Sequence, residues 1–288
     1  MKITDILAQP KPSLSFEVFP PKKDAPLEPV RAAVARLAKA SPSFMSVTYG
    51  AAGTANVNSV PLASFVQNEC RTTALAHLTC VTATREKIRA EAARLRAAGV
   101  ENILALRGDV PAGEAAGVAD YRHAVDLVRD LSDIGGFCLG GACYPECHPA
   151  CPRLSDDIAF LKDKVDAGLG FLTTQMFFDN NVYFRYLCKL RAHGISVPVI
   201  AGIMPVTNGR QIARICQLSG THLPNRFRAI VDRFGEDPAA MLDAGVAYAT
   251  EQIVDLFANG VPAVHLYTMN KPDVAERIVA GLRHITGA

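Results

Sequence analysis

The run LSFEVF at residues 14–19 is the first of eight short apolar runs that together indicate the fold. Such runs are typical of strands buried on both faces. The others are FMSVTY at 44–49, ALAHLTC at 74–80, NILAL at 102–106, and runs at 137–143, 171–174, 199–203 and 263–267. Most of their starts lie roughly 30 residues apart, the length of one strand–helix unit. Eight such units in series predict an α/β fold, a closed (β/α)8 TIM barrel of the kind that typically takes ~250 residues.

Helical periodicity fills the segments between the runs. In residues 84–98, Ile88, Ala92 and Leu95 share one face, and Thr84 is the expected N-cap. Ser155 is expected to cap the helix after strand five. Residues 204–262 separate the last two runs, which predicts extra helices inserted between strands seven and eight, one of them over 238–259. The chain contains neither GxGxxG nor GxxxxGK[ST], so an open doubly wound sheet is disfavoured. We therefore expect residues 1–288 to form a single catalytic barrel domain with no regulatory domain after it.

Composition limits the partners of this barrel. The net charge is +2 and charged residues make up 20% of the chain, which indicates no field strong enough to attract nucleic acid or a membrane surface. No apolar stretch approaches the ~18 residues of a membrane-spanning helix, and the first residues do not resemble a secretory signal. We therefore expect a cytoplasmic protein whose eight cysteines are thiols.

Glu17 is the most informative polar residue, because it interrupts an apolar strand. Alternation places Phe16 and Val18 on one face and Glu17 on the other, together with Ser15 and Phe19. A carboxylate that points into a barrel is costly unless it is paired or protonated, and burial raises its pKa toward the range of a general acid. The alternative is a structural ion pair with a lysine or arginine inside the barrel.

Other polar side chains follow the remaining runs, at the end of the barrel where active sites lie. Asp109 is either a functional carboxylate or a turn residue. Arg107 either binds phosphate or solvates the rim. His77 is by default a core histidine whose hydrogen bonds are satisfied. Gln175 either contacts a substrate amide or closes a polar cluster.

Three cysteines and a histidine occur together in CYPECHPAC at 143–151. They are residue types that bind zinc or an iron–sulfur cluster, but their spacing differs from that of zinc knuckles and ferredoxins. Free thiols are the favoured interpretation. The alternative is a barrel enzyme with a metal centre on Cys143, Cys147 and Cys151.

Taken together, the motifs resemble the methylenetetrahydrofolate reductase family over nearly the whole chain. The resemblance is carried by SFEVFPPK, FMSVTYGA, AHLTC, ILALRGDVP, CYPECHP, DLVRD, LKDKVDAG, TTQMFFDN, AGIMPVTN and HLYTMNKP. It implies a flavoprotein oxidoreductase of one-carbon metabolism and methionine biosynthesis. Such an enzyme reduces 5,10-methylenetetrahydrofolate to 5-methyltetrahydrofolate through FAD, with NADH or NADPH as the donor, by a ping-pong hydride transfer.

The resemblance also implies roles for individual residues. Glu17 would be the general acid that opens the folate imidazolidine ring, Asp109 the carboxylate near flavin and pterin, and Gln175 a contact to nicotinamide and folate in turn. Gln211 and Lys271 would lie on the folate side. The positions implied to line the FAD are Thr48, Tyr49, Ala51, His77, Arg107, Gly108, Asp109, Ala124, Tyr144, His148, Asp157 and Lys164. No resident metal is implied.

The chain departs from enterobacterial relatives at several of these places. Phe160 and Asp163 replace an asparagine and an arginine on the cofactor-facing helix. Phe160 shares a face of that helix with Asp157 and Lys164, and this face is either solvated or an anion site. Lys271 replaces an arginine expected to hold the folate tail. The resemblance favours a homo-oligomer. A partner reductase that supplies electrons, or a non-catalytic folate- or flavin-binding subunit of an electron-transfer complex, is the remaining alternative.

Overall fold

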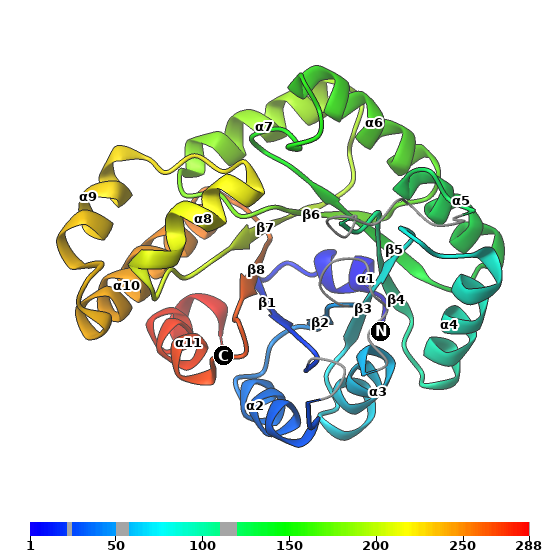
Figure 1. Cartoon of the computed structure of the whole chain (residues 1–288), viewed down its shortest axis with the longest axis horizontal. Coiled ribbons are helices and arrows are strands. Elements are labelled where there is room, and N and C mark those ends of the chain that lie inside the picture. Colours follow the sequence, from blue (N-terminus) through cyan, green and yellow to red (C-terminus); the bar gives the residue numbers. More distant parts are fainter. Residues whose placement is uncertain (22–24, 50–57, 110–119, 288) are drawn as a thin grey trace.

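Eight parallel strands close into one barrel in the computed structural model, which describes residues 1–21, 25–49, 58–109 and 120–287 (Figure 1). Each strand pairs with the next, and β1 closes the ring against β8. The predicted (β/α)8 barrel is thereby confirmed, with every strand within two residues of its predicted bounds. The strands are β1 (Ser13–Val18), β2 (Met45–Val47), β3 (Ala74–Thr79), β4 (Asn102–Leu106), β5 (Cys138–Cys143), β6 (Phe171–Thr174), β7 (Val199–Ile203) and β8 (Ala263–Tyr267).

Helices connect the strands and surround the barrel (Figure 1). Three of them, α8, α9 and α10, lie between β7 and β8 in the chain. The helices are α1 (Ile3–Leu7), α2 (Glu28–Ala38), α3 (Ser59–Ser64) with the π-helical turn η2 (Phe65–Glu69), α4 (Arg85–Ala97), α5 (Ala124–Ile134), α6 (Leu154–Asp166), α7 (Asn180–Ala192), α8 (Gly209–Ser219), α9 (Asn225–Phe234), α10 (Pro238–Ala258) and α11 (Pro272–Thr286).

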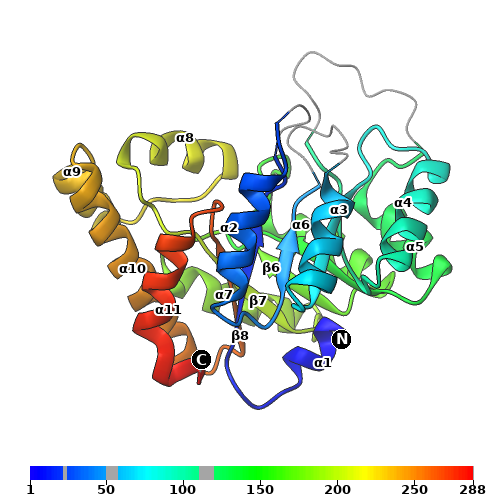
Figure 2. The same ribbon diagram turned by 90° about the horizontal axis from the view of Figure 1, so that it is seen from below.

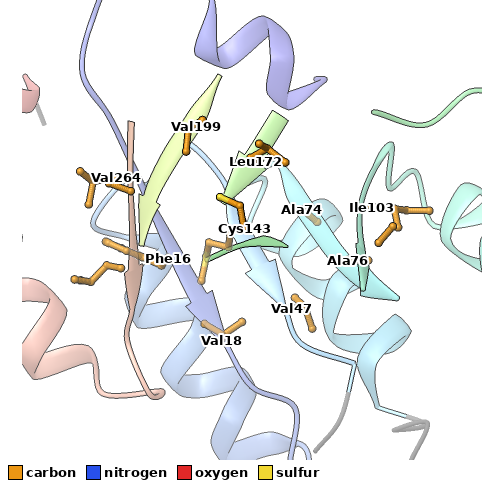
Figure 3. Close-up of a cluster of buried hydrophobic side chains, with 14 of the residues drawn as sticks. Phe16, Val18, Val47, Ala74, Ala76, Ile103, Cys143, Leu172, Val199 and Val264 are labelled. Atoms are coloured by element: carbon orange, nitrogen blue, oxygen red, sulfur yellow. The ribbon is translucent and has the colours of Figure 1, made fainter. Parts of the chain in front are cut away.

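The main hydrophobic core lies between the barrel wall and the surrounding helices. Phe16 and Val18 on β1 belong to it and are fully buried, as alternation along the strand predicts. Figure 3 shows these two side chains with others from the outer face of the barrel, including Val47, Ile103 and Val264. The inner face is left to Ser15, Glu17 and their counterparts on other strands.

The short helix α1 covers the end of the barrel opposite α8 (Figure 2). Its Ile3 and Ile6 pack in a second apolar cluster with barrel residues such as Phe44 and Phe171. The side chain of Asn102 fixes this helix, because its Oδ1 accepts a hydrogen bond from the Ile3 amide at 2.9 Å. This plug leaves the opposite end, where the strands end, as the side open to ligands.

Of the two helix caps predicted from the sequence, one is confirmed and one is wrong. The Thr84 side chain accepts a hydrogen bond from the Lys87 amide, as predicted. The predicted cap at Ser155 is wrong: α6 begins at Leu154, and the N-cap position is Arg153 without a side-chain cap. The Ser155 hydroxyl lies inside the first turn and donates to Asp156 instead. Among the described residues, no helix is both long and apolar enough to cross a bilayer.

Candidate functional site

A cavity of about 280 Å³ opens at the ends of the strands. It extends inward to Leu75 and Leu104, which also contact the plugged end of the barrel. Most of its wall is apolar, which favours an organic ligand over a hydrated ion. The lining residues are Glu17, Phe19, Leu75, His77, Leu104, Leu106, Ala142, Tyr144, Thr173, Thr174, Gln175, Met176, Met204, His265, Tyr267 and Met269.

Glu17 is the one carboxylate among these lining residues. Its side chain is 12% exposed, and its nearest ionisable partners are two histidines: His77 Nε2 at 3.6 Å and His265 Nε2 at 3.9 Å from Glu17 Oε2. Among the described residues, no lysine or arginine forms an ion pair with it, so none of them makes the structural ion pair considered from the sequence. Burial raises the pKa of Glu17 from 4.5 to about 8, and the Ser46 hydroxyl opposes this only in part. Glu17 is therefore an uncharged acid near neutral pH.

The two histidines beside Glu17 are neutral. Burial lowers the pKa of His77 to about 3, and burial together with His77 lowers the pKa of His265 to about 3. His77 Nε2 is buried and has no hydrogen-bond partner among the described residues. The default interpretation of His77 as a satisfied core histidine is therefore wrong. An unpaired polar atom at the wall of a cavity is available to hydrogen-bond with a ligand or with water.

His265 was not predicted as a site residue, although the alternation used for Glu17 would have found it. Val264 and Leu266 point into the outer core, so His265 and Tyr267 point inward. His265 Nδ1 lies 2.7 Å from Ser15 Oγ, and its Nε2 lies 3.0 Å from Ser46 Oγ. The imidazole is thus held between two serines of β1 and β2.

Two further side chains on the wall are fixed through backbone atoms. Tyr267 donates its hydroxyl to the Thr174 carbonyl at 2.5 Å, which ties β8 to the end of β6. Gln175 Oε1 accepts from the Met176 amide at 2.9 Å, so its Nε2 is the end available to a ligand. These contacts place both side chains in the cavity wall in defined orientations.

The residues implied to line the flavin lie at the ends of β2 to β5 and on α5 and α6, except that Ala51 lies outside the described residues. Of this set, His77 and Tyr144 line the cavity. The cavity wall does not include the others, which are Thr48, Tyr49, Arg107, Gly108, Asp109, Ala124, His148, Asp157 and Lys164. Tyr49 is buried in the main hydrophobic core, and we call the other eight the flanking surface on the β2–β5 side of the cavity.

The turn after β4 depends on Gly108. Its φ of +82° lies in the left-handed region, and a Cβ there would come within 2.8 Å of Val81 Cγ1. This turn puts Asp109 in an exposed position. Burial raises the pKa of Tyr144 to about 12, and the charges of Asp109 and Asp157 add to the effect. Asp109 therefore lies near enough to Tyr144, a residue of the cavity wall, for its charge to contribute to this shift.

The face of α6 that carries Asp157, Phe160 and Lys164 is partly buried. Lys164 donates to the Ala142 carbonyl at 3.2 Å, and burial lowers its pKa. Asp157 Oδ2 accepts from the His148 amide at 3.0 Å. Phe160, by contrast, is 62% exposed. A wholly solvated face is therefore excluded for Lys164, whose ammonium group lies close to the end of β5.

Gln211 and Lys271 lie on the β7–β8 side. Gln211 is exposed in the first turn of α8. Lys271 Nζ donates to Thr207 Oγ1 at 2.9 Å across the space between the loops that follow β8 and β7. Neither residue lines the cavity; both lie beside it, on the loop and helix that follow β8 and β7.

Cys143 at the end of β5 and the two cysteines in the loop after it do not form a ligand set. Cys143 is buried, and Cys147 Sγ donates to the Cys151 carbonyl at 3.4 Å. The described part of the chain holds no group of three or more His, Cys, Asp or Glu side chains that could bind a metal ion. The alternative of a metal centre on these cysteines is therefore not supported.

The family model described as methylenetetrahydrofolate reductase matches residues 2–283. A 5,10-methylenetetrahydrofolate reductase of Pectobacterium carotovorum is 34% identical, over 92% of this chain and 88% of that protein. Methylenetetrahydrofolate reductase (NADH) 1 of Arabidopsis thaliana is 33% identical, and the match covers 98% of this chain but 50% of that protein. The chain thus spans about half the length of the plant relative.

The fold is also similar to that of a solved structure, an uncharacterized protein from Clostridium thermocellum that binds two copies of 5-methyl-5,6,7,8-tetrahydrofolic acid. The TM-score is 0.66 at 14% identity, with 100% of this chain and 99% of that chain covered. At this identity the similarity concerns the barrel fold alone.

Proposed function

The chain belongs to the methylenetetrahydrofolate reductase family, and on that premise we propose that it reduces 5,10-methylenetetrahydrofolate to 5-methyltetrahydrofolate. The observation that carries the proposal is Glu17, a buried carboxyl group kept in its acid form inside the cavity. Reduction of the methylene group requires that a carbon–nitrogen bond of the imidazolidine ring first be opened. An uncharged acid in a water-poor site is suited to that step.

Glu17 performs the proton transfer. Its carboxyl group gives a proton to the folate nitrogen, the bond from that nitrogen to the methylene carbon breaks, and the other nitrogen keeps the carbon as an iminium ion. The carboxylate left behind lies beside this cation in a site of low polarity, where opposite charges attract strongly. The two neutral histidines beside Glu17 do not compete with the iminium ion for the negative charge.

The residues present fit a flavin. His77 Nε2 is an unpaired buried polar atom in the wall, and the flanking surface on the β2–β5 side offers Arg107, Lys164 and backbone groups at its rim. A bound FAD supplies the hydride chemistry, in which NADH or NADPH and then the folate use one site in turn, a ping-pong scheme. We assign FAD binding to Thr48, Tyr49, Ala51, His77, Arg107, Gly108, Asp109, Ala124, Tyr144, His148, Asp157 and Lys164.

The residues that would hold the folate lie in the cavity wall, at its rim and on the β7–β8 side of the cavity. Gln175 presents its amide from the cavity wall, and Asp109 orients the pterin from the rim. Lys271, beside Thr207, is placed to meet a carboxylate of the folate tail, with Gln211 on the neighbouring helix. These assignments rest on the matched motifs and on where the side chains lie.

The test separates the two half-reactions in Glu17→Gln. We expect the folate half-reaction to slow by about 10²–10⁴-fold, the usual contribution of a general acid. Reduction of bound flavin by NADH or NADPH needs no acid and should keep its rate. Glu69→Gln, an exposed glutamate paired with Arg31, is the matched control. Unchanged folate turnover in Glu17→Gln would refute the acid role.

A further inference from the structure

The Ser46 hydroxyl has two acceptors within reach but only one proton. Ser46 Oγ lies 3.0 Å from His265 Nε2 and 3.5 Å from Glu17 Oε2. A hydroxyl can donate one hydrogen bond at a time, and a distance of 3.5 Å is long for a bond between oxygens. The state of Glu17 therefore depends on which acceptor takes this proton.

Ser15 determines the tautomer of His265. Ser15 Oγ lies 3.1 Å from the Val264 carbonyl and 2.7 Å from His265 Nδ1, and when it donates its one proton to the carbonyl it accepts from Nδ1. The neutral imidazole has a single proton, which must then be on Nδ1. Nε2 is consequently an acceptor, and it takes the Ser46 proton.

We propose that His265 is a positioning residue that holds the Ser46 hydroxyl proton away from Glu17 and so keeps Glu17 in its acid form before substrate is protonated. With this proton on His265, Ser46 offers Glu17 only its lone pairs, which suit a protonated carboxyl group. After Glu17 has given its proton to the substrate, rotation of the Ser46 hydroxyl lets it donate to the new carboxylate. This proposal rests on the acid role of Glu17 proposed above.

The other groups that face Glu17 cannot take over the role of the Ser46 hydroxyl. They are His77 on β3 and Tyr267 on β8, and burial keeps both uncharged near neutral pH. His77 Nε2, at 3.6 Å, has no partner among the described residues and can accept the acid proton after a small approach. Ser46 is thus the hydroxyl whose direction distinguishes acid from carboxylate.

His265→Phe removes the acceptor and keeps the ring. His265 stacks on Phe44 with ring centroids 5.6 Å apart, and a phenyl ring can keep that contact. Ser15 retains the Val264 carbonyl as its acceptor. Ser46 is left with Glu17 as its side-chain acceptor, so its hydroxyl should stabilise the carboxylate.

The experiment is an infrared titration of the protein without flavin or folate. The carboxylic C=O band of Glu17 is assigned by its loss in Glu17→Gln, and its midpoint is measured in wild type, His265→Phe, Ser46→Ala and the double variant. A hydrogen bond to a charged group should lower the midpoint in His265→Phe by about 1–2 pH units. In His265→Phe/Ser46→Ala the hydroxyl is gone, and the midpoint should return to the wild-type value or above.

If His265→Phe folds poorly, Ser15→Ala tests the same proposal. Ser15→Ala frees the imidazole to carry its proton on Nε2, so Ser46 can turn to Glu17 and the midpoint should again fall. Equal midpoints in wild type and both single variants at residues 15 and 265 would overturn the proposal, as would a shift that persists without Ser46. Either outcome, with folate reduction still lost in Glu17→Gln, would reject the role of His265 and leave the proposed function standing. A wild-type midpoint near 4.5 would instead reject the acid itself.

Discussion

Replacing Glu17 by glutamine is expected to make the stability of the protein less dependent on pH. Burial raises the pKa of this carboxyl group from 4.5 to about 8, so the folded protein binds its proton more tightly than the unfolded chain. Below pH 4.5 the group is protonated in both states and does not change the free energy of unfolding. As the pH rises through the range between 4.5 and 8, the unfolded chain loses the proton first, and the folded state is progressively destabilised.

The magnitude follows from the same two pKa values. A difference of 3.5 pH units at about 1.36 kcal/mol each is about 5 kcal/mol of folding free energy. Glutamine has the same shape and stays neutral, so it removes this cost. Between pH 5 and pH 9 the stability of Glu17→Gln relative to wild type should therefore increase by about 4 kcal/mol.

Urea unfolding at several pH values measures this difference. The chain contains no tryptophan, so circular dichroism is the appropriate signal. Other titrating groups are common to both proteins and cancel in the comparison, and the exposed Glu69→Gln serves as the control for replacing a glutamate elsewhere in the chain. A stability difference between Glu17→Gln and wild type that stays constant from pH 5 to pH 9 would refute the reasoning that burial holds Glu17 in its acid form.

Three further predictions concern other parts of the site. Lys271→Met should raise KM for the folate about fivefold, the effect of losing about 1 kcal/mol at an exposed charge, with the nicotinamide half-reaction unchanged; a loss confined to flavin reduction would contradict it. Gly202→Ala should destabilise the barrel by about 1–3 kcal/mol in the same urea assay, because its Cβ would collide with the Thr174 carbonyl and the Tyr267 hydroxyl; wild-type stability would contradict that account. The double variant Cys147→Ser/Cys151→Ser should keep wild-type folate turnover and metal content, since these thiols contact their own loop; joint loss of activity and bound metal would restore the metal alternative.

The strands could be predicted from sequence because they are buried on both faces and therefore form continuous apolar runs. Helix α1 was not predicted, because five residues are too few to show helical periodicity. Its role as a plug follows from long-range contacts, such as that of Asn102 with the Ile3 amide. Ser155 was misassigned as a cap because the exact start of a helix depends on where the preceding loop leaves the barrel.

The site was predicted unevenly for a physical reason. Glu17 was found because a charged residue inside an apolar strand is conspicuous. His265 was not predicted, although its alternation with Val264 and Leu266 carries the same signal, because a histidine is less conspicuous than a carboxylate in an apolar strand. The neutral state of both histidines and the single proton shared around Ser46 depend on distances between strands far apart in the sequence, which no local pattern contains.

An anaerobic spectral titration tests most directly whether the protein reduces 5,10-methylenetetrahydrofolate through bound FAD. The protein is loaded with FAD, NADH or NADPH is added, and 5,10-methylenetetrahydrofolate follows, with the folate product identified by mass spectrometry. The account predicts that one nicotinamide cofactor bleaches the flavin bands, that the folate restores them, and that one 5-methyltetrahydrofolate forms for each flavin reoxidised. A reduced flavin that the folate leaves bleached, in a protein that binds both, would contradict it.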